Sequence, residues 1–143
     1  MQVKEIMTHD VEMVNSDVKL PEVARKMKEL EVGALPIWED EELIGIITDR
    51  DIVVRAIAEG KDMLNTPVSE VMTPEVFYCL ENDDLSEAAK IMEEESIHRL
   101  LVLNNEGDPT GFVSLADFSV KCHNEHLVYE VLEQISGPAC PHR

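Results

Sequence analysis

The feature that most constrains the fold of this chain is an internal repeat. Ile6-Met7-Thr8 matches Val71-Met72-Thr73 at an offset of 65 residues, and Leu20–Met27 matches Leu85–Met92 at the same offset. Farther along, the offset becomes 66, which requires one inserted residue in a turn of the second copy. The sequence therefore predicts two copies of one structural unit.

Each copy has the same order of predicted elements: strand, helix, strand, strand, helix. Alternating apolar residues predict a strand at Val11–Val14, and apolar residues at helical spacing predict a helix over Leu20–Glu31 that ends before Gly33. The remaining predicted strands are Ala34–Trp38, Leu43–Ile47, Val76–Leu80, Leu100–Leu103 and Gly111–Ser114. The remaining predicted helices are Asp51–Glu59, Leu85–Ser96, one from about Asp117, and His126–Ser136.

The repeat also predicts the domain organisation. We assign the first repeat to residues 1–60, a linker to 61–67, the second repeat to 68–122, and a C-terminal helix and tail to 123–143. A single unit of this size buries too little apolar surface to be stable alone. We therefore expect an α/β (α+β) fold in which two β-α-β-β-α repeats pack about a pseudo-twofold axis, with two similar clefts between them.

Composition excludes several classes of function. The 143 residues include 30 acidic and 12 basic side chains, a net charge of −18, which disfavours binding to nucleic acid or to an anionic membrane surface. Three cysteines without a framework spacing argue against a disulfide-stapled secreted domain. The chain has no apolar leader and no run of apolar residues long enough to span a bilayer, so we expect a cytoplasmic protein.

One heptapeptide in each copy carries the functional prediction. Gly45-Ile46-Ile47-Thr48-Asp49-Arg50-Asp51 recurs, altered, as Gly111–Asp117, and each follows a predicted strand and begins a predicted helix. A hydroxyl residue three positions before an acidic residue is typical of a capping box. A helix N-terminus that follows a glycine also suits a nucleotide, with a phosphate near Thr48 or Ser114 and a ribose on Asp51 or Asp117. Both interpretations stay open at this point.

Positive charge for a phosphate has three candidate sources. Arg50 lies inside the first motif, Arg55 lies on the following helix, and His98-Arg99 begins a predicted strand in the second copy. The alternative for each arginine is a surface salt bridge of little energetic value. His98-Arg99 is the more telling pair, because apolar residues lie on both sides of it.

Together, these residues resemble a known family. Two tandem copies of Met-Thr, a helix and Gly-x-x-hydrophobic-Thr/Ser-x-x-Asp are similar to a pair of cystathionine β-synthase (CBS) domains, a Bateman module, over about residues 1–122. The resemblance implies an adenine-nucleotide-binding regulatory module (AMP, ADP or ATP), frequent homodimers and a regulated protein partner. S-adenosylmethionine or NAD are the alternative ligands.

The resemblance also implies site residues by position. Asp51 and Asp117 would hold the riboses, and Thr48 and Ser114 would meet phosphate or ribose, with Arg50 nearby in the first motif. The residues that would flank the adenine or the phosphate are Gly33, Ala34, Pro36, His98, Arg99, Val11, Met13, Val76 and Tyr78.

Two other functions compete with this prediction. An enzyme is the weaker class, because no nucleophile–base pair or paired carboxylates stand out, and we expect no catalytic residues and no required cofactor. A protein-interaction or dimerisation module, in which the motifs only cap helices, is the stronger alternative. The C-terminal residues Cys122, His123, His126, Cys140 and His142 resemble metal ligands, but their spacing fits no common template and we expect no metal site.

Overall fold

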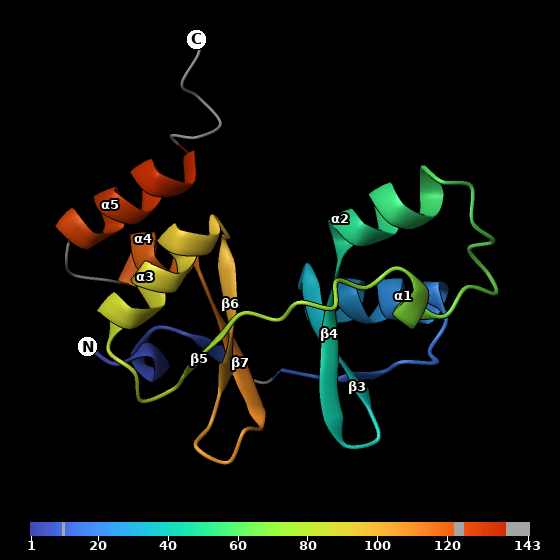
Figure 1. The fold of residues 1–143 in the computed structure, drawn as a ribbon, viewed down its shortest axis with the longest axis horizontal. Helices are drawn as coiled ribbons and strands as arrows, with labels where there is room; N and C mark the ends of the chain where they lie inside the picture. The colour runs from blue at the N-terminus through green and yellow to red at the C-terminus, as the bar shows by residue number, and fades with distance from the viewer. Residues whose placement is uncertain (10, 122–124, 137–143) are drawn as a thin grey trace, which may run out of the picture. The chain divides into compact units, whose positions relative to one another are not determined.

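The computed structural model describes residues 1–9, 11–121 and 125–136 (Figure 1). The chain divides into two compact units. The first unit is Glu12–Val76, and the second unit combines Met1–Val11 with Phe77–Arg143. Each unit is an α+β structure with its own sheet and its own apolar core.

The first unit contains a three-stranded sheet in the order β2-β3-β4. β2 is Val14–Asn15, β3 is Ala34–Glu39 and β4 is Glu42–Thr48; β2 pairs parallel to β3, and β3 pairs antiparallel to β4. Its helical elements are α1 (Leu20–Leu30), α2 (Asp49–Asp51), the π-helical η2 (Ile52–Ile57) and the 3-10 helix η3 (Val68–Glu70). The core side chains are Val14, Leu20, Val23, Met27, Leu35, Ile37, Ile47, Ile52, Ala56, Val68 and Val71.

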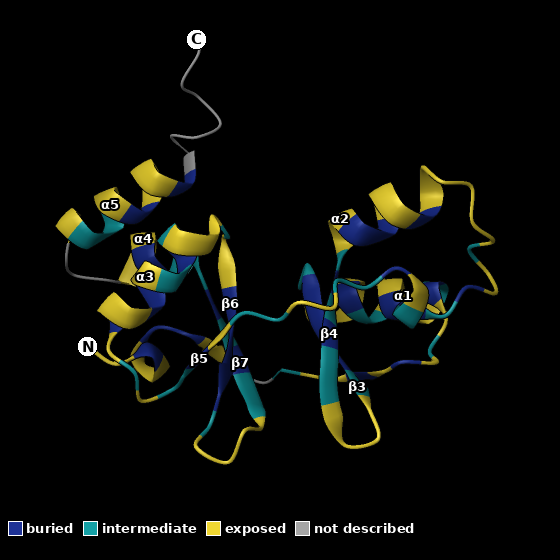
Figure 2. Cartoon of the chain, in the orientation of Figure 1, coloured by how far each residue is buried: buried dark blue, intermediate teal, exposed yellow. Residues whose placement is uncertain are grey.

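The second unit contains a four-stranded sheet in the order β1-β7-β6-β5. Its elements are η1 (Val3–Glu5), β1 (Thr8–His9), β5 (Tyr78–Leu80), α3 (Leu85–Glu95), β6 (Arg99–Leu103), β7 (Pro109–Ser114), α4 (Leu115–Lys121) and α5 (Glu125–Ser136). α5 contacts both α3 and α4 (Figure 1) and places Val131 and Ile135 in the core. Buried and exposed residues alternate along α5 at helical spacing (Figure 2), so the buried face of this helix covers its own unit, while Leu132 stays 40% exposed.

The compact units differ from the sequence repeats, because each repeat contributes its first segment to the other sheet. β1 comes from the first repeat and pairs with β7 of the second, with Thr8 opposite Phe112. Reciprocally, Thr73 exchanges two backbone hydrogen bonds with Ile46 of β4, at 2.9 and 2.8 Å. The residues predicted as a linker, 61–67, belong to the first unit.

Element boundaries differ from the prediction in a few places. The strand predicted at Val11–Val14 is β2, Val14–Asn15, and the Met-Thr segment that forms β1 was not predicted as a strand. α1 ends at Leu30 because Glu31 adopts a left-handed conformation (φ 57°), and Ser96 ends α3 in the same way (φ 54°). The Val32 N–H then bonds to the Met27 carbonyl oxygen, which satisfies the helix end before Gly33 is reached.

Among the described residues, no helix combines the length and apolar character needed to cross a membrane.

Candidate functional site

The duplicated motif forms a capping box in both units. In the first unit, the Asp51 N–H donates to Thr48 Oγ1 at 3.0 Å, and the Thr48 N–H donates to Asp51 Oδ2 at 3.0 Å. In the second unit, the Asp117 N–H donates to Ser114 Oγ at 3.2 Å, and the Ser114 N–H donates to Asp117 Oδ2 at 2.9 Å. The helix-capping interpretation is therefore confirmed, with each aspartate fixed by the turn that begins its helix.

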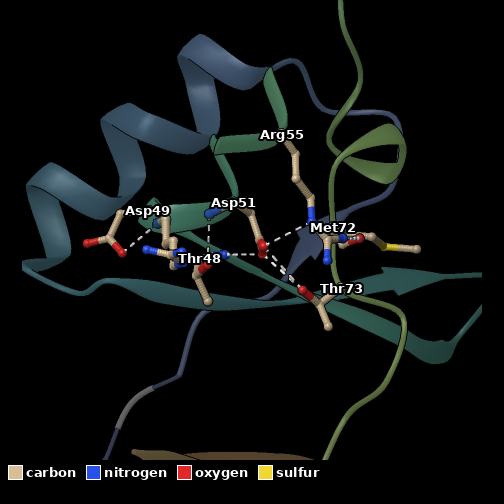
Figure 3. Close-up of polar contacts among 7 residues, drawn as sticks. Thr48, Asp49, Asp51, Arg55, Met72 and Thr73 are labelled. Carbon is tan, nitrogen blue, oxygen red and sulfur yellow. Dashed lines mark hydrogen bonds and ion pairs between the residues drawn. The ribbon is translucent and has the colours of Figure 1, made fainter. Parts of the chain in front are cut away.

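Asp51 has further partners from beyond the motif (Figure 3). The Thr73 hydroxyl lies 3.2 Å from both carboxylate oxygens, and Arg55 Nε lies 3.7 Å from Oδ1. Arg55 Nη1 also donates to the Met72 carbonyl oxygen at 3.1 Å. With its side chain buried among these donors, Asp51 is 8% exposed, and it combines a fixed carboxylate with a neighbouring cation.

Asp117 has a related but less complete set of partners. Lys121 Nζ lies 3.6 Å from Asp117 Oδ1 and donates to the Ile6 carbonyl oxygen at 3.2 Å, so it occupies the role of Arg55. The Ser114 hydroxyl lies 3.1 Å from Asp117 Oδ2. The structure shows no hydrogen bond between the Thr8 hydroxyl and Asp117 in the described part of the chain, although Thr8 is the repeat counterpart of Thr73. Asp51 and Asp117 thus each accept two hydrogen bonds, but the hydroxyl that donates to Asp117 belongs to its own motif, whereas the hydroxyl that donates to Asp51 belongs to the Met-Thr segment.

At both motif glycines, the space that a side chain would fill is taken by other parts of the chain. A Cβ at Gly45 would lie 2.7 Å from Met72 Sδ and 2.8 Å from the Thr73 carbonyl oxygen. A Cβ at Gly111 would overlap the carbonyl oxygen of Thr8. The two Met-Thr segments therefore approach the motif glycines at close range, and the approach of a ligand to the motif stays a prediction.

The neighbouring strand places further predicted residues beside each motif. In the first unit, the Asp49 N–H donates to the Gly33 carbonyl oxygen at 3.0 Å, and Ala34 pairs with Thr48 across β3 and β4. Pro36, on the same strand, pairs with Ile46.

The second unit repeats this arrangement with charged residues. The Leu115 N–H donates to the His98 carbonyl oxygen at 2.8 Å, and Arg99 pairs with Ser114 across β6 and β7. Both His98 and Arg99 are exposed, as is Arg50 in the first unit. The exposed guanidinium groups of Arg99 and Arg50 lie close enough to the hydroxyl residue of each motif to contact an anionic ligand bound there.

The other predicted ligand residues are distributed between the units. Met13 and Val76 belong to the first unit, and Val11 and Tyr78 belong to the second. Met13 is 36% exposed and Tyr78 is 51% exposed. No hydrogen bond or strand pairing joins any of these four described residues to a motif, so their ligand role stays a prediction.

Outside the motifs, we find no sign of a reactive thiol or a metal site among the described residues. Burial, together with the charge of Asp83, raises the pKa of Cys79 to about 12, so the thiol stays protonated at neutral pH. His126 is exposed and lies 3.0 Å from Glu130 on α5. No cluster of metal-ligating side chains occurs among the residues described, and the predicted Cys122, His123, Cys140 and His142 group lies outside them.

Sequence reasoning missed the residues that complete each aspartate's surroundings. Thr73 and Lys121 were not selected, and Arg55 was considered as a phosphate ligand or as half of a surface salt bridge, without Asp51 as its partner. The repeat held the signal, since Arg55 and Lys121 are equivalent at an offset of 66 and Thr8 and Thr73 at an offset of 65. A basic residue four positions after each motif aspartate indicates an ion pair on one helix face.

Comparisons with known proteins agree with this architecture. The CBS domain family matches the chain twice, over residues 3–57 and 68–123, and the protein belongs to that family. It is 37% identical, over 94% of both chains, to the CBS domain-containing protein YhcV of Bacillus subtilis (strain 168).

Solved structures of CBS domain proteins have the same fold. The CBS domain pair of protein MJ0100, in complex with 5-methylthioadenosine and S-adenosyl-L-methionine, matches with a TM-score of 0.73 and 27% identity over 83% of this chain and 93% of that one. The CBS domain protein PAE2072 from Pyrobaculum aerophilum, complexed with AMP, matches with a TM-score of 0.76 and 20% identity over 92% and 98%. Hypoxic Response Protein I, with two coordinated zinc ions, matches with a TM-score of 0.73 and 31% identity over 85% and 98%.

Proposed function

We propose that this protein is a regulatory module that binds an adenosine-containing ligand and acts on a partner protein. The observation that carries the proposal is the duplicated Thr/Ser-x-x-Asp turn, in which a fixed carboxylate lies beside a hydroxyl group and a cation in both units. Structural neighbours that bind AMP, 5-methylthioadenosine or S-adenosyl-L-methionine support the choice of ligand class.

Each group of the proposed ligand has a chemically suited partner. Asp51 and Asp117 accept hydrogen bonds from the ribose hydroxyls, since a carboxylate offers about four acceptor positions. Ser114 and Arg99 would bind a phosphate in the second unit, because a hydroxyl and a guanidinium pair well with phosphate oxygens. The first unit has Thr48 with Arg50, so we expect the two motifs to differ in their preference for charged ligands.

Isothermal titration of the full chain with AMP, ADP, ATP, NAD, S-adenosylmethionine and 5-methylthioadenosine tests this function. At least one compound should bind the wild-type protein, and Asp51→Ala or Asp117→Ala should remove binding at its own motif. Asp49→Ala is the matched control, because Asp49 is an exposed acidic residue of the same turn whose side chain, among the described residues, accepts a hydrogen bond from the Arg50 N–H and from no other group. Failure of every compound to bind would favour the interaction module, and turnover of a nucleotide would favour an enzyme.

We also propose that the protein assembles as a homodimer through the face of η2. Val53, Val54 and Ile57 are 55%, 43% and 57% exposed there, and Val120, the repeat counterpart of Val54, is 79% exposed. Burial of such residues against a second copy would remove apolar surface from water. In sedimentation equilibrium, Ile57→Asp should shift a wild-type dimer towards monomer; a monomeric wild-type protein would contradict the assembly without affecting the ligand proposal.

A further inference from the structure

The main chain between the two units leaves the first unit at Thr73, next to Asp51. Thr73 is held by two backbone hydrogen bonds with Ile46, and no further strand pairing follows before β5 of the second unit. Asp51 accepts a hydrogen bond from the Thr73 hydroxyl, and Arg55 donates one to the Met72 carbonyl oxygen. The two side chains therefore hold two adjacent residues, Met72 and Thr73 (Figure 3). The last attachment of the connecting segment is therefore bonded directly to the proposed ribose-binding carboxylate.

Asp51 accepts two hydrogen bonds in this arrangement, and Arg55 lies beside its Oδ1. Oδ2 receives the Thr48 N–H, and the single proton of the Thr73 hydroxyl is shared between Oδ1 and Oδ2 at 3.2 Å each. A ribose that offers two hydroxyl donors to Asp51 has to compete with Thr73 for the same oxygens. The Thr73 hydroxyl offers one proton shared between two oxygens, whereas a ribose offers two well-directed hydroxyl donors, so the ribose can displace it.

The second unit provides an internal comparison. Its motif lies beside the segment that leads from β1 towards the first unit, and Lys121 joins Asp117 to the Ile6 carbonyl oxygen. Asp117, however, has no hydrogen bond with the hydroxyl of Thr8 in the part of the chain that is described. Direct competition between a ribose and a connecting-segment hydroxyl thus arises at Asp51 and not at Asp117.

We propose that Asp51, Arg55, Met72 and Thr73 form a ligand-sensitive latch, in which a ribose that binds Asp51 displaces the Thr73 hydroxyl and loosens the connecting segment. This inference rests on the proposed function and adds its mode of regulation. The signal passed on is the release of residues 73–76, the last residues of the first unit before the chain enters the second at Phe77. Thr73 acts as a positioning residue for this segment and lowers the affinity of Asp51 for nucleosides.

The test compares Thr73→Val with the wild-type protein in titrations with adenosine. Loss of a competing hydrogen bond should raise the affinity at the Asp51 motif on the order of 3- to 10-fold. Thr73→Ser keeps the hydroxyl and should behave like the wild type, and Thr8→Val is the matched control in the second unit and should change nothing. Binding of 2′,3′-dideoxyadenosine, which lacks the diol, should be equally strong in the Thr73→Val and wild-type proteins.

Hydrogen exchange gives a second measure of the latch. In the wild-type protein, saturating adenosine should speed exchange of the Thr73 and Ile46 amides severalfold, since these two residues bond to each other. In Thr73→Val, these amides should already exchange faster without ligand, and adenosine should add little.

The outcomes separate the two proposals. Adenosine binding by the wild type with unchanged or weaker affinity in Thr73→Val would overturn the latch alone, as would slower exchange of Thr73 on binding. Absence of binding by every adenosine compound would overturn the proposed function, and the latch with it.

Discussion

The two motif glycines leave no room for a side chain. Each lies where a Met-Thr segment crosses a strand at close range, and a side chain there would meet backbone atoms. Neither Gly45 nor Gly111 has a positive φ, so close packing and not backbone conformation explains the requirement for glycine. The usual argument from glycine's conformational freedom does not apply at these two positions.

We predict that Gly111→Ala and Gly45→Ala both destabilise the fold, by about 1–3 kcal/mol as is typical of overpacking. Gly111→Ala should cost more, because its new methyl group overlaps the Thr8 carbonyl oxygen, whereas part of the obstruction at Gly45 is the flexible Met72 side chain. Urea unfolding measures both changes. A Gly111→Ala protein as stable as the wild type would show that the β1 segment is not held against β7.

At the scale of the element, α3 begins with a charged cap. Asp84 accepts hydrogen bonds from the Ser86 hydroxyl and from the Ser86 N–H, and these bonds lower the pKa of the Asp84 carboxyl below its ordinary value of 3.8. The repeat counterpart of Asp84 is Lys19, which gives α1 no side-chain cap. α3 thus relies on an ionised cap and α1 does not.

We predict that Asp84→Asn lowers the melting temperature of the protein at neutral pH. The difference in melting temperature from the wild type should disappear in acid. Because the folded pKa is lowered, the stabilisation is present above pH 3.8 and is lost as the pH falls through the folded value. Thermal melting of both proteins from pH 7 to pH 2.5 measures the effect. A difference in melting temperature that stays constant over this range would contradict the assignment.

The elements also show how far sequence reasoning reaches. The repeat predicted the family, the order of the helices and strands, and the capping boxes, because these depend on local patterns that occur twice. It did not predict β1, since Thr8 and His9 have no apolar alternation and pair only through a strand about one hundred residues away. The contacts of Asp51 with Thr73 were missed because they depend on tertiary packing, and because Thr8, the repeat counterpart of Thr73, forms no such hydrogen bond in the described part of the chain.

At the scale of the whole molecule, the exchange of first segments decides which fragments can fold. A fragment of residues 1–65 contains the first repeat but lacks Val68, Val71 and Thr73, which complete the core and the sheet edge of the first unit. A fragment of residues 12–76 has the same length and contains them all.

We predict that the 12–76 fragment unfolds cooperatively and at a higher temperature than the 1–65 fragment. Circular dichroism melting measures the difference. In NMR spectra, the amide proton signals should be well dispersed for 12–76 and poorly dispersed for 1–65. Equal stability of the two fragments would show that the sequence repeat, and not the compact unit, is the folding unit.

The same exchange has a consequence for synthesis on the ribosome. β1 is translated before the whole of the first unit, whereas β7, with which it pairs, is translated after that unit. The first unit can close as soon as residue 76 has left the exit tunnel, whereas the leading segment stays unpaired until β7 appears. β1 therefore lacks its partner strand while the first unit folds, and the sheet of the second unit is complete only when β7 pairs with β1.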